Sequence, residues 1–177
     1  MWSFVWKIAL WSCLLSFGPL AQAQNDADCT QHALMVRGKT AFDKKQYIKT
    51  ERLMDRLLAQ QPTCHEAYYW KGQCAEQFED YSAAYEAYSI ACQMDQAPYF
   101  IARGDLLRTL GTIRLQTPST CGDCGKQLLP DVSAADPPVV YFKRAVLDYQ
   151  QALRLNPDSA AARTALQQAN EFIQRQL

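Results

Sequence analysis

The stretch YYWKGQCA, residues 68–75, decides the fold of this chain together with the residues that follow it. Its Gly72 recurs 34 residues earlier as Gly38, and Tyr81 recurs at the same interval as Tyr47. A short polar stretch precedes each tyrosine and indicates a turn between two helices. Self-similarity at a fixed period of this length is the signature of stacked supersecondary units. We therefore expect an all-α protein built from repeated helical hairpins.

Two copies of this unit, about 31–64 and 65–97, resemble the tetratricopeptide repeat. That family's pattern has small residues at positions 8, 20 and 27 and aromatic residues at positions 4, 11, 17 and 24. The second copy supplies Tyr68, Gly72, Tyr81, Ala84, Tyr88 and Ala91 at six of these seven positions. The first copy is poorer and keeps Leu34, Gly38, Tyr47 and the closing Pro62. The resemblance implies a superhelix that binds other proteins and has no enzymatic activity.

A third copy, 98–157, is interrupted by an insertion at about 114–138. Its first helix carries Gly104, and residues 110–113 have the composition expected of the turn between its two helices. The second helix follows only at residues 141–156, which places 29 extra residues in this repeat. Residues 158–177 then form an amphipathic helix that would cap the last apolar face. The expected architecture is three hairpins plus a capping helix, the third hairpin interrupted by a long loop.

Residues 1–23 have the features of a signal peptide. Lys7 is their only charged residue, an apolar run from Ile8 to Leu20 follows, and the small-x-small sequence ends at Ala23. We expect cleavage after Ala23 and export to the periplasm or the secreted space. A membrane anchor is disfavoured because the apolar run is shorter than the roughly 20 residues that span a bilayer. A lipoprotein site at Cys13 is disfavoured because Trp11 stands where a small residue is needed.

The charge balance and the scarcity of histidine exclude several classes of function. The chain has 18 basic and 18 acidic residues, so no charge excess attracts nucleic acid. Only two histidines are present, and the order of side chains needed for nucleophilic catalysis is not apparent. We expect no enzymatic activity, no cofactor, no metal and no small-molecule substrate.

Six cysteines remain after residues 1–23, and an oxidising compartment favours their pairing. The expected pairs are Cys29–Cys64, Cys74–Cys92 and Cys121–Cys124. The alternative for Cys74 and Cys92 is that they are small buried core residues. The motif Cys121-Gly122-Asp123-Cys124 also admits thiol-disulfide or zinc chemistry, although no second motif supplies the remaining zinc ligands. That chemistry is the alternative function, and docking through the insertion is a third.

The resemblance places a concave groove on the first helix of each hairpin. The residues expected to line it are Met35, Lys39, Phe42, Glu66, Tyr69, Gln73, Glu76, Ile101, Asp105 and Arg108. Such a partly apolar groove suits a peptide or a partner subunit, which an envelope complex would supply. Phe42 is alternatively a core residue.

Overall fold

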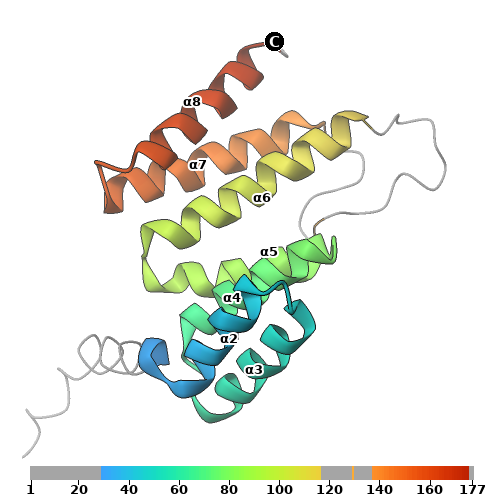
Figure 1. The fold of residues 1–177 in the computed structure, drawn as a ribbon. Coiled ribbons are helices and arrows are strands. Elements are labelled where there is room, and N and C mark those ends of the chain that lie inside the picture. The colour runs from blue at the N-terminus through green and yellow to red at the C-terminus, as the bar shows by residue number, and fades with distance from the viewer. Residues whose placement is uncertain (1–28, 117–128, 130–136, 176–177) are drawn as a thin grey trace, which may run out of the picture.

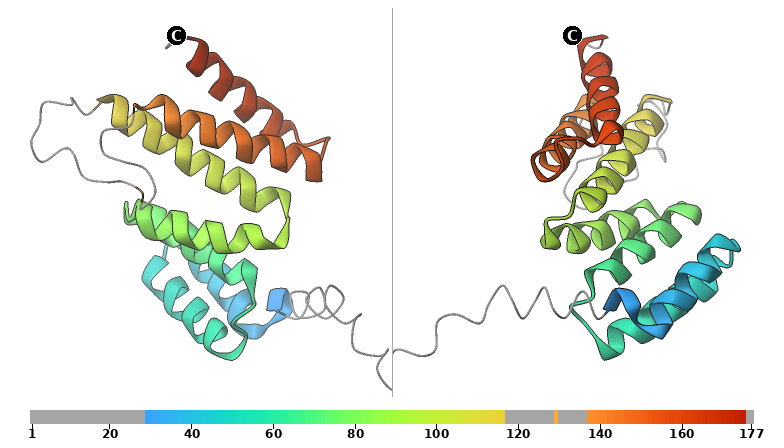
Figure 2. Two further views of the ribbon diagram at one scale, coloured as in Figure 1. Left: turned by 180° about the vertical axis from the view of Figure 1, so that it is seen from behind. Right: turned by 60° about the vertical axis from the view of Figure 1, so that its left-hand side comes forward.

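The computed structural model describes residues 29–116, 129 and 137–175. These residues form three antiparallel helical hairpins followed by a single helix, stacked in chain order (Figures 1 and 2). The helices are α2 (Ala33–Asp43), α3 (Tyr47–Gln60), α4 (His65–Gln77), α5 (Tyr81–Ala91), the 3-10 turn η1 (Cys92–Met94), α6 (Ala97–Gln116), α7 (Val139–Leu155) and α8 (Ala160–Arg175). The expected all-α array of three hairpins and a terminal helix is confirmed.

The first two hairpins are copies of each other in backbone detail as well as in sequence. The turn after α2 contains Lys45 with φ 57°, and the turn after α4 contains Glu79, 34 residues later, with φ 58°. Both residues adopt the left-handed conformation, which reverses the chain after a helix. The Asp80 carboxylate then caps α5 by accepting a hydrogen bond from the Ala83 amide at 3.2 Å.

Each hairpin is closed by a glycine on its first helix and a bulky side chain on its second. The pairs are Gly38 with Met54, Gly72 with Tyr88, and Gly104 with Tyr149. A Cβ atom built on Gly72 would lie 2.5 Å from the Tyr88 ring, so only glycine allows the two helices to approach this closely. The glycine precedes its partner by 16 residues in the first two hairpins and by 45 in the third. The difference is the 29 extra residues expected from the sequence.

The third hairpin is longer than the other two, and this corrects the turn expected at residues 110–113. Those residues lie inside α6, which continues to Gln116. A second glycine pair explains the extension: Gly111, one heptad after Gly104, packs against Phe142, one heptad before Tyr149. A Cβ atom on Gly111 would lie 2.4 Å from the Phe142 ring. The second contact layer allows α6 and α7 to pack along a greater length.

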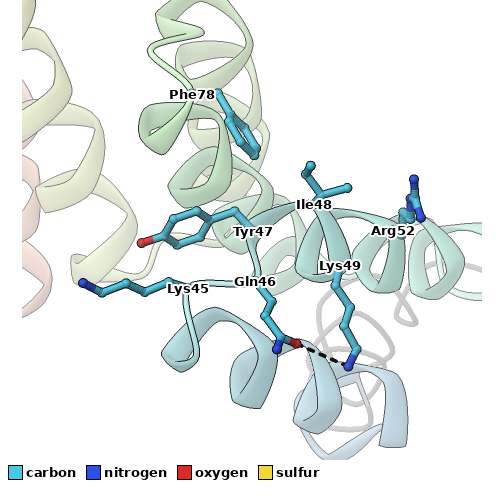
Figure 3. A pocket seen from close by; sticks show the side chains of 7 residues that line it. All are labelled: Lys45, Gln46, Tyr47, Ile48, Lys49, Arg52 and Phe78. Carbon is cyan, nitrogen blue, oxygen red and sulfur yellow. Dashed lines mark hydrogen bonds between the residues drawn. The ribbon is translucent and has the colours of Figure 1, made fainter.

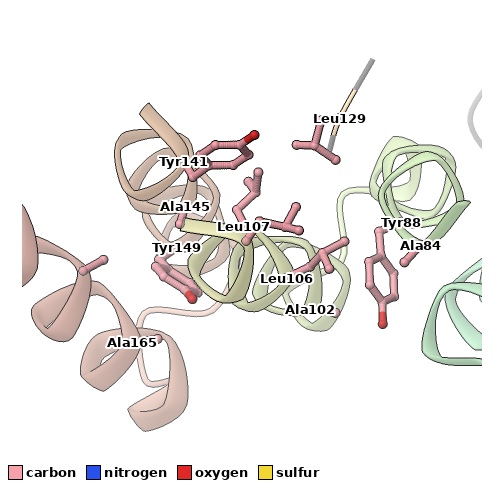
Figure 4. Close-up of a cluster of buried hydrophobic side chains, with 12 residues drawn as sticks. Ala84, Tyr88, Ala102, Leu106, Leu107, Leu129, Tyr141, Ala145, Tyr149 and Ala165 are labelled. Atoms are coloured by element: carbon pink, nitrogen blue, oxygen red, sulfur yellow. The ribbon is translucent and has the colours of Figure 1, made fainter. Parts of the chain in front are cut away.

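Leu129 is the one residue between 117 and 136 that the structure describes. Its side chain is 1% exposed and belongs to the largest core cluster, with Leu107 of α6 and Tyr141 of α7. Figure 4 shows it on the side of α6 and α7 that faces α5. At least one residue of the insertion is therefore part of the core.

The terminal helix α8 covers α7 with small side chains. Ala162 and Ala169 are fully buried, and Phe172 stacks on Phe142 with ring centroids 3.7 Å apart. None of the helices in the described residues is long and apolar enough to cross a membrane. The expected signal peptide, residues 1–23, lies outside them.

Candidate interaction surface

The first helices α2, α4 and α6 share one side of the array, which we call the inner face. An ion pair joins the first two of them, since Lys39 Nζ lies 2.5 Å from Glu66 Oε1. Trp70 supports both partners: its indole Nε1 donates to Glu66 at 3.3 Å, and its ring lies 5.9 Å from the Lys39 ammonium. These contacts hold two charged groups of the inner face in a defined arrangement.

Aromatic rings continue the inner face from α2 to α6. Phe42 contacts Trp70 with ring centroids 5.1 Å apart, and Trp70 contacts Tyr69 at 5.5 Å. Tyr69 in turn contacts Tyr99 of α6 at 5.4 Å. The edge-to-face and tilted geometries are those that aromatic pairs prefer. One row of rings therefore links all three hairpins.

The tyrosine that packs on Gly72 also positions polar groups of α4. The Tyr88 hydroxyl accepts a hydrogen bond from Gln73 Nε2 at 2.7 Å and donates one to the Glu76 carboxylate. Burial raises the pKa of the Glu76 carboxyl; the Tyr88 hydrogen bond opposes this, and the Asp105 charge adds to it. Gln73 and Glu76 are thus held in one arrangement by a buried ring.

The third hairpin repeats this arrangement one level along the array. The Tyr149 hydroxyl donates to Asp105 Oδ1 at 2.8 Å, and Arg108 lies 3.2 Å from the same oxygen. Burial raises the pKa of the Tyr149 hydroxyl, so this group stays a hydrogen-bond donor. The Asp105 and Arg108 side chains are 45% and 39% exposed, which leaves a fixed pair of opposite charges open to solvent.

One of the expected groove residues does not line this face. Met35 is fully buried among Leu34, Met54 and Ala67, because the next hairpin covers this side of α2. The other nine residues expected to line the groove are half-buried. Phe42 is held between the Trp70 and Tyr47 rings, as in the alternative of a packing role, and Ile101 packs against a core cluster. Groove binding by this set stays a prediction.

Comparison with known families agrees with this geometry. The family model described as Tetratricopeptide repeat matches residues 35–99, which span the first two hairpins and the start of α6. The first two hairpins are tetratricopeptide repeats. No curated protein matches the chain. The third hairpin of this repeat protein lies almost entirely outside the matched residues.

The disulfide of the repeat protein joins the two ends of its first hairpin. Cys29 and Cys64 are bonded, with S–S 2.09 Å and Cα atoms 5.8 Å apart. The expected Cys74–Cys92 bond is not formed; both thiols are free and buried. Cys74 lies near Glu51 of α3, whereas Cys92 lies near Arg103 of α6, so each thiol has a neighbour on a different adjoining hairpin. These two thiols are core residues, which was the alternative interpretation.

Burial makes these two thiols unreactive. It raises the pKa of Cys74 and of Cys92 to about 12, well above the range in which a thiol supplies a nucleophilic thiolate at neutral pH. Cys121 and Cys124 lie outside the described residues, and with them the alternative of redox or zinc chemistry. Within the described residues, no group of three or more His, Cys, Asp or Glu side chains is arranged to hold a metal ion.

A second surface was not anticipated from the sequence. Where the turn after α2 approaches the end of α4, an open depression of about 490 Å³ is lined by Lys45, Gln46, Tyr47, Ile48, Lys49, Arg52 and Phe78 (Figure 3). Its sequence signal was the pair Lys44-Lys45 in one turn and the exposed Phe78 in the equivalent turn of the next repeat. The repeat alignment that revealed the hairpins places these two turns at the same position of successive units.

Proposed function

We propose that this protein is an exported interaction scaffold that binds a peptide or a partner subunit on its inner face. Tetratricopeptide repeats support protein–protein interaction as the general function. Binding on the inner face and location in the cell envelope or secreted space are part of this proposal. The proposal is for a scaffold without catalysis.

The observation that carries the proposal is the fixed arrangement of polar groups on α2, α4 and α6. Glu76 is held by Tyr88 and Asp105 by Tyr149, in both cases through a ring that also closes the hairpin. A side chain already ordered in the free protein loses less conformational entropy when a ligand binds. The inner face is therefore suited to recognition of an extended segment, with rings for apolar contact and alternating charges for register.

Two observations support export. The features of residues 1–23 are those of a cleaved leader. The bond between Cys29 and Cys64 is of a kind that persists in oxidising compartments and is rare in the cytosol. The test is to isolate the protein from the envelope or medium of its host and sequence its N-terminus, which should begin at Gln24. A chain still starting at Met1 would contradict cleavage.

The inner face is tested with a charge-removing double variant, Lys39→Ala with Arg108→Ala, whose side chains reach solvent. The matched control is Lys143→Ala with Arg154→Ala on α7, both exposed. Partners captured from an envelope extract by the unchanged protein are identified, purified and titrated against each variant by calorimetry. We expect binding to weaken about tenfold or more for the inner-face variant alone, the usual scale for an interface centre.

Circular dichroism shows whether each variant keeps its helices. Equal affinity of the inner-face variant and the unchanged protein for every purified partner would refute the inner face as the binding site. It would leave the general role of the repeats as an interaction module untouched.

A further inference from the structure

The depression beside the turn after α2 combines exposed apolar groups with positive charge. Ile48 and Phe78 are 57% and 49% exposed, two of the largest exposed fractions among the apolar side chains of the described residues. The Phe78 ring meets the Tyr47 ring edge-on with centroids 6.2 Å apart. This contact holds one side of the Phe78 ring and leaves the other side open to a ligand.

Three cations surround these apolar groups. The lining contains Lys45, Lys49 and Arg52 and, among the described residues, no carboxylate. Lys49 donates to Gln46 Oε1 at 3.3 Å, a neutral partner that leaves its charge uncompensated. Figure 3 shows these side chains spread around the start of α3.

A second, smaller depression continues the same surface. It measures about 250 Å³, shares Gln46 and Lys49 with the first, and adds the basic residues Arg37 and Lys44. Val36, another exposed apolar side chain, also lines it. The two depressions meet at Gln46 and Lys49 and together form a basic strip.

Among the described residues, no carboxylate lines either depression. Asp55, on the same hairpin, is engaged by Lys71 of α4 at 2.5 Å. From residue 29 to residue 60 the chain has seven basic and three acidic residues, in a protein whose overall charge is zero. The first hairpin therefore carries an excess of positive charge, which favours an acidic ligand.

We propose that the larger depression of this strip, lined by Lys45, Lys49, Arg52, Ile48 and Phe78, binds an acidic peptide segment of a partner protein. An apolar side chain of the peptide enters the recess between Ile48 and Phe78, and flanking carboxylates meet the three cations. The surface lies at the edge of the array, apart from the polar groups of the inner face. It therefore adds a second binding surface to the proposed function, and either one can fail alone.

The shape of the surface favours a peptide over a membrane. Anionic lipid attracts basic residues, but a bilayer takes up apolar side chains that protrude, as those of an amphipathic helix do. Here Ile48 and Phe78 are walls of a recess, and a recess is filled by a side chain that enters it. An anionic bilayer is accordingly an outcome of the test that would overturn the proposal.

The probe is a fluorescein-labelled peptide in which Leu-Phe is flanked on both sides by runs of Glu and Asp, titrated against the full-length protein by fluorescence anisotropy. A second peptide has Gly-Ser in place of Leu-Phe, and a third has Lys and Arg in place of the acidic residues. We expect the Gly-Ser peptide to bind with an affinity at least roughly threefold lower than that of the Leu-Phe peptide, since it lacks the apolar anchor. The basic peptide should not bind, and binding of the acidic probe should weaken as salt is added.

The variant is Lys49→Glu with Arg52→Glu, which are exposed and outside the core, and the control with the same charge change is Lys143→Glu with Arg154→Glu on α7. We expect Lys49→Glu with Arg52→Glu to weaken binding of the acidic probe about tenfold or more, and the control to leave that binding nearly unchanged. Ile48→Ser should remove the preference for Leu-Phe over Gly-Ser. Equal loss in both charge variants, no binding of the acidic probe, or binding only to phosphatidylglycerol-containing vesicles would overturn the proposal.

Discussion

At the scale of single residues, the glycines of the first helices set how closely each hairpin packs. Their neighbours differ in stiffness. The atom nearest to a Cβ on Gly38 is the terminal methyl of Met54, at 2.0 Å, whereas on Gly72 it belongs to the Tyr88 ring. The Tyr88 ring is also tied to Gln73 and Glu76 through its hydroxyl, so it has less freedom to shift. Methionine adapts more easily than a hydrogen-bonded ring.

Alanine at these positions should therefore have unequal effects. We expect Gly72→Ala to lower the free energy of unfolding by about 1–3 kcal/mol, because overpacking outweighs the better helix propensity of alanine. Gly38→Ala should be close to neutral, since the Met54 methyl can rotate away. Urea unfolding followed by circular dichroism measures both. A Gly38→Ala variant less stable than Gly72→Ala would show that the ring contact does not set the spacing.

The buried Glu76 carboxyl should make stability depend on pH. The folded-state pKa of Glu76 lies above the ordinary value of 4.5, and burial is the largest cause of this shift. The folded protein then binds more protons than the unfolded chain, and stability falls as pH rises from 4.5 through the folded pKa. Glu76→Gln keeps an acceptor for Tyr88 and removes the titration. Its stability relative to the unchanged protein should increase across that pH range.

Thermal unfolding at a series of pH values measures this difference. Glu86→Gln, on an exposed position of α5, is the matched control and should show a constant difference. A Glu76→Gln variant whose relative stability is flat with pH would mean that the carboxyl titrates alike in the folded and unfolded chains.

At the scale of elements, the sequence predicted the first two hairpins well because their contacts repeat at a fixed interval. Gly72 and Tyr88 occupy pattern positions, and their contact recurs in the structure. The same pattern failed at Gly111, because a glycine near the expected end of a helix indicates a turn equally well. Only its partner Phe142, which is distant in sequence, shows that Gly111 is a packing position.

The orientation of side chains around a helix was the second feature that could not be predicted reliably from the sequence. Cys74 follows Gly72 by two residues, about 200° around the helix, so it cannot face the same partner helix. The sequence position alone suggested that Cys74 and Cys92 face each other. Likewise, Met35 was expected to be open to a ligand, but the following hairpin covers it. Such errors arise because a repeat pattern specifies each unit and not what covers its ends.

The third hairpin is joined across α6 and α7 by a bidentate ion pair. Arg103 Nε and Nη2 donate to the two Asp148 oxygens at 2.9 and 2.6 Å, with Asp148 9% and Arg103 20% exposed. We expect Asp148→Ala to lower the free energy of unfolding by about 2–4 kcal/mol, because the guanidinium loses its partner while still mostly buried. Chemical unfolding of the variant measures this.

The double variant Asp148→Leu with Arg103→Met separates the two possible causes. It removes both charges, so most of the lost stability should return if the penalty comes from an unpaired buried charge. A double variant as unstable as Asp148→Ala would assign the penalty to lost packing instead.

At the scale of the whole molecule, stacking leaves the two ends of the array with fewer neighbours than its middle. The C-terminal end is covered by α8, whose Phe172 stacks on Phe142. At the N-terminal end of the described residues, the Cys29–Cys64 bond holds the start of α2 near the start of α4. A covalent link thus stabilises the hairpin that also carries the basic strip.

Removing this link should lower the stability of the whole array. Its two cysteines are 35 residues apart, and closing a loop of this size in the unfolded chain stabilises a protein by roughly 2–4 kcal/mol. We expect Cys29→Ser with Cys64→Ser to lower the free energy of urea unfolding by about that amount. Dithiothreitol should lower the free energy of unfolding of the unchanged protein by the same amount, and that of the double variant much less.

Buried Cys74 and Cys92 should be alkylated only after unfolding. Alkylation of either thiol in the native protein would contradict their burial. A double variant as stable as the unchanged chain would contradict a stabilising role of the link, because the N-terminal hairpin would then stay closed over its core without it.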